Sequence, residues 1–181
     1  MHRILKSIFA KMVDESYSTH EKELLEYVFI VYSYELIKAF IIIAAFFIMG
    51  YLKESLIICS VMFISRPFIG GYHEDTQFKC LIATFISVLW ILILGKNSQL
   101  TFYGNILFVM LSIFCIWNQA PVIDEKMPIT KQHLINRNRI IGTVIVSIFA
   151  MLSVFLYEKS VYYIFITWTI VFEALMMFKK N

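Results

Sequence analysis

Residues 81–95 read LIATFISVLWILILG, a stretch without any charged side chain or proline. Similar uncharged runs cover residues 39–52, 55–65, 98–123, 140–157 and 160–172. The whole chain is 60% apolar and 16% charged, whereas a soluble domain has about a quarter of its residues charged and under half apolar. Roughly 20 apolar residues in a helix cross a hydrocarbon layer about 30 Å thick. The sequence therefore predicts an all-α, polytopic membrane protein with about six membrane helices.

These helices would use most of the 181 residues, so we expect a single membrane-embedded domain over residues 1–181. Residues 1–26 are expected to form a cytoplasmic or interfacial region, and residues 27–178 the membrane helices. Residues 2–12 place apolar side chains at helical spacing among three basic residues. This pattern is typical either of an amphipathic helix on the membrane surface or of a first turn packed on the protein's own helices.

Most helix boundaries follow from caps and breaks. Ser18 and Glu21 have the spacing of a capping box, which predicts a long helix that ends near Met49. The next run, residues 55–65, covers only about half of the hydrocarbon layer at 1.5 Å per residue, so its helix either spans with help from its flanks or reaches partway. Because Pro67 follows, we expect this helix to end near Arg66. Further helices are expected near residues 76–94, 100–117, 139–157 and 160–178.

The distribution of basic residues predicts the orientation in the membrane. If the N-terminus is cytoplasmic and six segments cross, the outer side holds Lys53, Lys96 and Lys159. The cytoplasmic side then holds twelve basic residues: Arg3, Lys6, Lys11, Lys22, Arg66, Lys79, Lys126, Lys131, Arg137, Arg139, Lys179 and Lys180. This asymmetry agrees with the positive-inside rule. We therefore expect both termini and the loop between Arg66 and Lys79 on the cytoplasmic side.

Residues 66–80, RPFIGGYHEDTQFKC, gather a glycine pair, a histidine, carboxylates and a cysteine at a predicted membrane boundary. A thiol becomes a nucleophile when a nearby imidazole takes its proton. On one continuous helix His73 and Cys80 would lie about 10.5 Å apart along the axis, too far for direct proton transfer. The pair can work only if His73 lies on a loop that folds back, with Asp75 capping a helix that begins at Thr76.

The residue pattern alone leaves a second reading open, in which His73 is solvated and Cys80 packs inside the protein. Cys59 and Cys115 lie in apolar runs and are expected to be core residues. The position four residues after His73 is Gln77, so the helical zinc motif is not present. We expect no metal, no cofactor and no nucleic-acid partner.

The same segment resembles the signature of the accessory gene regulator B family of bacterial membrane endopeptidases. That signature has an Arg, a Gly-Gly-x-His core and a Cys seven residues beyond the His, and the matching residues are Arg66, Gly70, Gly71, His73 and Cys80. Glu74 departs from the small residue that is usual in the family. The resemblance extends to chain length, hydropathy layout, the basic amphipathic start and an Ala-Pro…Lys-x-Pro-Ile connection, here Ala120-Pro121…Lys126-Met127-Pro128-Ile129.

The resemblance implies a cysteine endopeptidase of the bacterial cell membrane that matures a quorum-sensing propeptide. Cys80 would be the nucleophile, and His73 the general base and later the acid. The enzyme would cut off the C-terminal tail through a thioester, and an internal Cys or Ser of the propeptide would close a thiolactone or lactone ring. The implied partners are a propeptide with an amphipathic leader and an acidic tail, the lipid bilayer and a second copy of the chain in a homodimer.

Other charged residues have two readings each. Arg66 is either an inside-positive anchor or a group that orients the substrate or the loop. Glu35 and Lys38 form an ion pair, or Glu35 lines the substrate cavity. Glu173 raises the same question without a named partner. A basic cluster binds either lipid headgroups or the acidic tail of the propeptide, and its members are Lys131, His133, Arg137 and Arg139.

Two other classes of function remain as alternatives. A small transporter would also place charged residues within its spans, although no inverted repeat supports this reading. A non-enzymatic scaffold would present the amphipathic N-terminus to a partner. In the enzyme reading, a short helix before Arg66 would place the site in a cavity poor in water, slightly below the cytoplasmic surface.

Overall fold

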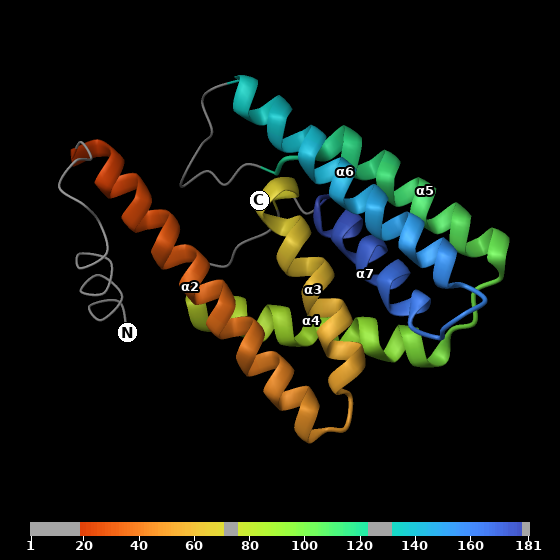
Figure 1. Ribbon diagram of the computed structural model, residues 1–181. Helices are drawn as coiled ribbons and strands as arrows, with labels where there is room; N and C mark the ends of the chain where they lie inside the picture. Colours follow the sequence, from red (N-terminus) through yellow and green to blue (C-terminus); the bar gives the residue numbers. More distant parts are fainter. Residues whose placement is uncertain (1–18, 71–75, 123–131, 179–181) are drawn as a thin grey trace. The chain divides into compact units, whose positions relative to one another are not determined.

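The computed structural model describes residues 19–70, 76–122 and 132–178, which form helices joined by short connections (Figure 1). Its helices are α2 (Thr19–Ile48), α3 (Leu52–Ile69), α4 (Gln77–Asn97), α5 (Phe102–Gln119), α6 (Gln132–Leu156) and α7 (Tyr163–Met176). Within these residues extended pairing is limited to an isolated parallel bridge between Gly70 and Val122. The all-α prediction is therefore confirmed for the described part of the chain. The predicted N-terminal amphipathic helix and the cap residue Ser18 lie outside it.

Four segments are long and apolar enough to cross a membrane: residues 29–48 in α2, and the helices α4, α5 and α6. α7 is apolar but has only 14 residues. α3 has 18 residues, about 27 Å at 1.5 Å each, and includes Lys53, Glu54 and Arg66. The structure thus supports four spans by length and composition, and the figure of about six stays a prediction.

The chain divides into two compact units, residues 1–42 and 43–181, with the boundary inside α2. In the first unit, the side chains of Lys38 and Glu35, one helical turn apart on α2, form an ion pair between Nζ and Oε1. Ser33 donates a hydrogen bond to the carbonyl of Phe29, 2.7 Å away. The ion pair agrees with the simpler of the two readings of Glu35 and Lys38.

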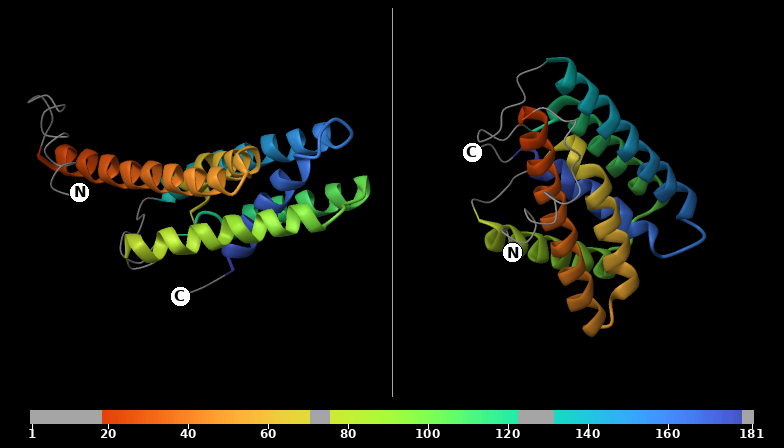
Figure 2. Two further views of the ribbon diagram at one scale, coloured as in Figure 1. Left: turned by 90° about the horizontal axis from the view of Figure 1, so that it is seen from below. Right: turned by 60° about the vertical axis from the view of Figure 1, so that its left-hand side comes forward.

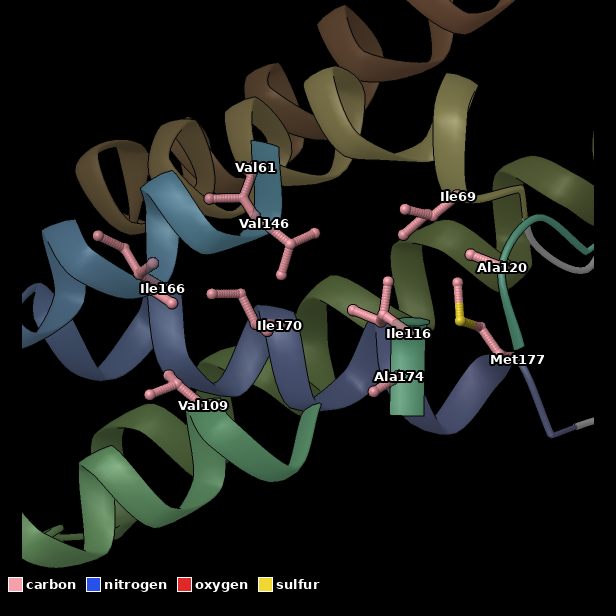
Figure 3. Close-up of a cluster of buried hydrophobic side chains, with 11 residues drawn as sticks. Val61, Ile69, Val109, Ile116, Ala120, Val146, Ile166, Ile170, Ala174 and Met177 are labelled. Carbon is pink, nitrogen blue, oxygen red and sulfur yellow. The ribbon is translucent and has the colours of Figure 1, made fainter. Parts of the chain in front are cut away.

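In the second unit, α7 contacts α3, α4, α5 and α6 and passes between them (Figure 1 and Figure 2). Its sequence, YIFITWTIVFEALM, is mostly apolar, and the polar residues Thr167, Thr169 and Glu173 are buried as well, as expected of a helix enclosed by other helices. Figure 3 shows Ile166, Ile170 and Ala174 of α7 among side chains from the neighbouring helices. The cluster also contains Val61, Ile69, Val109, Ile116, Ala120, Val146, Ala150 and Met177.

Buried polar side chains join three helices near the start of α7. Thr167 Oγ1 donates to Asn105 Oδ1 on α5, 2.5 Å away, and lies 2.6 Å from Ser153 Oγ on α6. Asn105, Ser153 and Thr167 are fully buried. Inside a membrane protein such groups need partners within the protein, and here the three side chains satisfy one another.

Contacts between connections show which helix ends lie together. Lys96 at the end of α4 pairs with Glu54 at the start of α3, 3.2 Å apart. The hydroxyls of Tyr157 and Tyr163, which flank the α6–α7 connection, both donate to the carbonyl of Leu100 in the α4–α5 connection. These connections contain or adjoin the lysines predicted to be on the outer side. Ile69 and Val122 meet at the opposite ends of α3 and α5, as the alternating topology requires.

The expected end of α3 near Arg66 is wrong. α3 starts at Leu52, earlier than the apolar run, and continues through Arg66 and Pro67 to Ile69. A proline in the last turn leaves the helical carbonyl of residue 63 without its usual donor, but only a short stretch of helix follows. Gly70 then ends the helix: its N–H still bonds to the carbonyl of Arg66, and its φ of 74° is in the left-handed region.

Candidate active site

Cys80 lies in the first turns of α4. Its N–H donates to the carbonyl of Thr76, 3.0 Å away, and its own carbonyl accepts from Thr84 Oγ1 at 2.8 Å. The thiol-bearing residue is only 8% exposed. A thiolate near the N-terminus of a helix is favoured by the helix dipole, and exclusion of water protects an acyl intermediate from hydrolysis. Its position at the start of α4 therefore favours a thiolate, whereas its exposed fraction is the same as that of Cys59 and does not distinguish the two thiols.

The predicted cap of this helix is off by one residue. Thr76, not Asp75, is the N-cap of α4: its side chain accepts a hydrogen bond from the N–H of Lys79 at 3.3 Å, and the helix begins at Gln77. Asp and Thr are both good N-caps and stand next to each other here. Cys80 consequently becomes the fourth residue of α4.

His73 and Gly71 lie outside the described residues, so their predicted roles stay predictions. The structure does describe both ends of the connection that carries them. Gly70 closes α3 on one side, and Thr76 opens α4 on the other. Helices α3 and α4 are in contact, and the ion pair between Glu54 and Lys96 joins their other ends.

The end of α3 before this connection is held by backbone contacts. Val122 donates its N–H to the carbonyl of Ile69 at 3.0 Å, next to the parallel bridge with Gly70. A Cβ atom at Gly70 would lie 2.3 Å from the carbonyl oxygen of Val122. The glycine of the signature is thus required both by its positive φ and by the close approach of another chain segment.

The basic side chains lie in different surroundings. Arg66, in the last turn of α3, is partly buried. Arg139 donates from Nε to the carbonyl of Ala120, 2.8 Å away. His133 and Arg137 are exposed on α6, and Lys131 is not among the described residues. The cluster predicted for lipid or tail binding therefore includes one member that already bonds to the end of α5.

Sequence reasoning named Glu173 but missed its partner. Ser65 of α3 lies with its Oγ 2.6 Å from Glu173 Oε1, and both residues are buried. Glu173 Oε2 has no hydrogen-bond partner among the described residues. The two residues are 108 positions apart, so no local pattern could have joined them. The pair connects the end of α3 to the central helix.

The other two cysteines are buried or partly buried. Cys59 is buried in α3, and Cys115 of α5 packs against the hydrophobic cluster, as expected of core thiols. Within residues 19–70, 76–122 and 132–178, no three His, Cys, Asp or Glu side chains gather as metal ligands would.

Comparison with known proteins agrees with the signature. The family described as Accessory gene regulator B matches residues 5–177. AgrB-like protein 1 of Clostridium perfringens (strain 13 / Type A) is 42% identical over 163 residues, which cover 88% of this chain and 87% of the relative. No solved structure matches. The chain therefore belongs to the accessory gene regulator B family, multi-pass membrane proteins of quorum-sensing propeptide processing.

Proposed function

We propose that the protein is a cysteine endopeptidase that removes the C-terminal tail of a quorum-sensing propeptide and supports its cyclisation. The observation that carries this proposal is the placement of Cys80: a buried thiol at the start of a helix, directly after the connection that contains His73. Family membership supports the reaction class. Arg66 and the bridged Gly70 lie immediately before that connection.

In this mechanism His73 takes the proton of the Cys80 thiol, and the thiolate attacks the carbonyl carbon at the cleavage site. The tetrahedral intermediate collapses, the peptide C–N bond breaks, and His73 returns the proton to the amine of the departing tail. The propeptide is then held by a thioester. An internal Cys or Ser of the propeptide attacks this thioester, closes the ring and gives its proton, through His73, to the Cys80 sulfur.

Exclusion of water decides whether the ring forms. Water that reached the thioester would release a linear acid instead of the cyclic product. The low exposure of Cys80, 8%, supports a site from which bulk water is largely kept away. With α3 about 27 Å long, we attribute this protection to burial of Cys80 in the protein and no longer to a short α3.

The proposed substrate is a propeptide with an amphipathic leader and an acidic tail. Arg66 is the proposed orienting cation beside the connection, and the exposed Arg137, together with Lys131, is the proposed docking site for the tail. We propose that the site and both termini face the cytoplasm. A homodimer completes the proposal.

The test is co-expression of the chain with its cognate propeptide, read by mass spectrometry. Wild type should give cleaved propeptide and an enzyme adduct that hydroxylamine releases. Cys80→Ala and His73→Ala should give neither, whereas the matched thiol removals Cys59→Ala and Cys115→Ala should retain the adduct. If Cys80→Ala processes the propeptide as well as wild type, the proposal is wrong. Substrate flux that survives Cys80→Ala would instead support the transporter reading.

A further inference from the structure

The end of α3 sits directly on a glycine of α6. Ile69 is 1% exposed, and a Cβ atom added to Gly142 would lie 2.6 Å from Ile69 Cγ2 and 3.3 Å from both the Ile69 nitrogen and the Phe68 carbonyl carbon. Ordinary contacts of a Cβ atom begin near 3.4 Å. A side chain at Gly142 would therefore push the last turn of α3 away by roughly 1 Å.

A second contact holds the same turn from the α5 side. The segment Ala120–Val122 leaves α5 in an extended form and bonds to the carbonyl of Ile69. We call this segment the strap. Val122 also forms the parallel bridge with Gly70, so the strap contacts the last residue of α3 and the residue after it.

Arg139 joins the strap to α6. Its Nε donates to the carbonyl of Ala120 at 2.8 Å, and Ala120 itself is 1% exposed. Arg139 and Gly142 are three residues apart on one helix, so they lie on neighbouring positions of one face. α6 therefore holds the end of α3 twice: by direct packing at Gly142, and through the strap by way of Arg139.

We propose that Gly142 and Arg139 are positioning residues: they fix Gly70, after which the connection that carries His73 begins, and so support the reaction at Cys80. His73 is three positions beyond Gly70 in the sequence, so we expect a displacement of Gly70 to affect the reaction. This inference rests on the proposed function, because it needs a working His73–Cys80 pair. It assigns Arg139 to the strap, and leaves lipid or tail binding to the other basic residues.

The first experiment compares two glycine substitutions. Gly142→Ala introduces a clash with Ile69 at 2.6 Å, and Gly95→Ala introduces one with the ring of Phe165 at 2.5 Å, at the far end of α4 from Cys80. Both variants should lose stability. Only Gly142→Ala should lose processing rate per folded protein, by about 10- to 100-fold for a 1 Å displacement of a reacting group.

Two further readouts separate positioning from general destabilisation. Alkylation of Cys80, followed at that residue by mass spectrometry, should reach half its maximal rate at a higher pH in Gly142→Ala than in wild type or Gly95→Ala. Ile69→Leu removes the Cγ2 methyl that the new Cβ meets, so it should restore part of the rate to Gly142→Ala and none to Gly95→Ala.

Arg139 is tested by two matched replacements. Gln places its amide nitrogen the same number of bonds from the backbone as Arg Nε but removes the charge, whereas Lys keeps the charge and moves the donor one atom further. The proposal expects Arg139→Gln to keep more of the processing rate than Arg139→Lys. The opposite order would assign Arg139 to charge recognition and overturn its part of the proposal.

The outcomes also separate this inference from the proposed function. If Cys80→Ala still processes the propeptide, the proposed function is wrong, and the positioning role is wrong with it. If Cys80→Ala is inactive but Gly142→Ala matches Gly95→Ala in rate per folded protein and in the pH of alkylation, the endopeptidase stands and the positioning role is wrong.

Discussion

Two threonines of α7 allow the stability of the buried polar network to be measured against a matched control. Thr167 and Thr169 are both fully buried. The Thr167 hydroxyl reaches Asn105 on α5 and Ser153 on α6, whereas the Thr169 hydroxyl bonds only to the carbonyl of Phe165 in its own helix, at 2.6 Å. Replacing each by Val removes the same atom from the same helix, but breaks contacts between helices only at Thr167.

The expected difference follows from what each replacement leaves behind. Thr167→Val takes the 2.5 Å donor from Asn105 Oδ1, whose other contact, Ser153 Oγ, is 3.4 Å away. A weakly satisfied buried amide costs about 1–3 kcal/mol, and hydrogen bonds between membrane helices average toward the low end of that range. We therefore expect Thr167→Val to lower the free energy of unfolding by about 1–2 kcal/mol, and Thr169→Val by about 0.5 kcal/mol or less, since the Phe165 carbonyl belongs to the helix itself.

The assay is reversible unfolding in mixed detergent micelles, followed by circular dichroism, with both variants and wild type under one condition. Equal losses of unfolding free energy in the two variants would refute the reasoning. They would mean that a hydroxyl bonded between helices stabilises the protein no more than one bonded within its own helix. A gain in stability for Thr167→Val would refute it as well.

Two further predictions concern Glu173 and the orientation. Glu173→Gln keeps an acceptor oxygen for the Ser65 hydroxyl and replaces the unpartnered carboxyl oxygen by an amide nitrogen, so its unfolding free energy should stay within about 1 kcal/mol of wild type, whereas Glu173→Ala should lose about 1–3 kcal/mol; a loss in the Gln variant as large as in the Ala variant would contradict this. For orientation, a membrane-impermeant thiol reagent applied to intact cells should label Lys159→Cys and leave Arg137→Cys unlabelled, and the reverse pattern would invert the proposed topology.

The sequence predicted the helices that depend on local signals. Uncharged runs and polar breaks placed both ends of α4 and α5, and the end of α6, within three residues of the observed bounds, because the apolar length of a membrane helix matches the thickness of the hydrocarbon layer. The predicted start of α6 near residue 139 was wrong: the helix begins at Gln132, in a polar segment that hydropathy does not mark. The start of α4 was missed by a single residue, since Asp75 and Thr76 are adjacent and both residue types serve as N-caps, with Asp preferred. Local sequence preferences could not decide which of the two adjacent residues caps the helix.

The end of α3 could not be predicted because contacts from distant residues decide it. Pro67 argues for a helix end on local grounds. Packing on Gly142 and the hydrogen bond from Val122 favour two more residues of helix, and both partners lie more than 50 residues away in sequence. The same holds for Ser65 and Glu173. The central place of α7 was missed for another reason: apolar side chains that face lipid and those that face protein look alike in a membrane sequence.

The position of α7 has a consequence for biosynthesis. Helices emerge from the ribosome in chain order, and α7 is the last described helix, yet four others pack around it. Until it inserts, Ser65 and Asn105 lack the partners that α7 supplies. A nascent chain halted before residue 160 would thus lack these contacts between helices, while Ser65 would keep its bond to the carbonyl of Val61 and Asn105 its bond to Ser153. For the proposed endopeptidase, we therefore expect activity to depend on insertion of α7, which holds the end of α3 through Glu173 and Ser65.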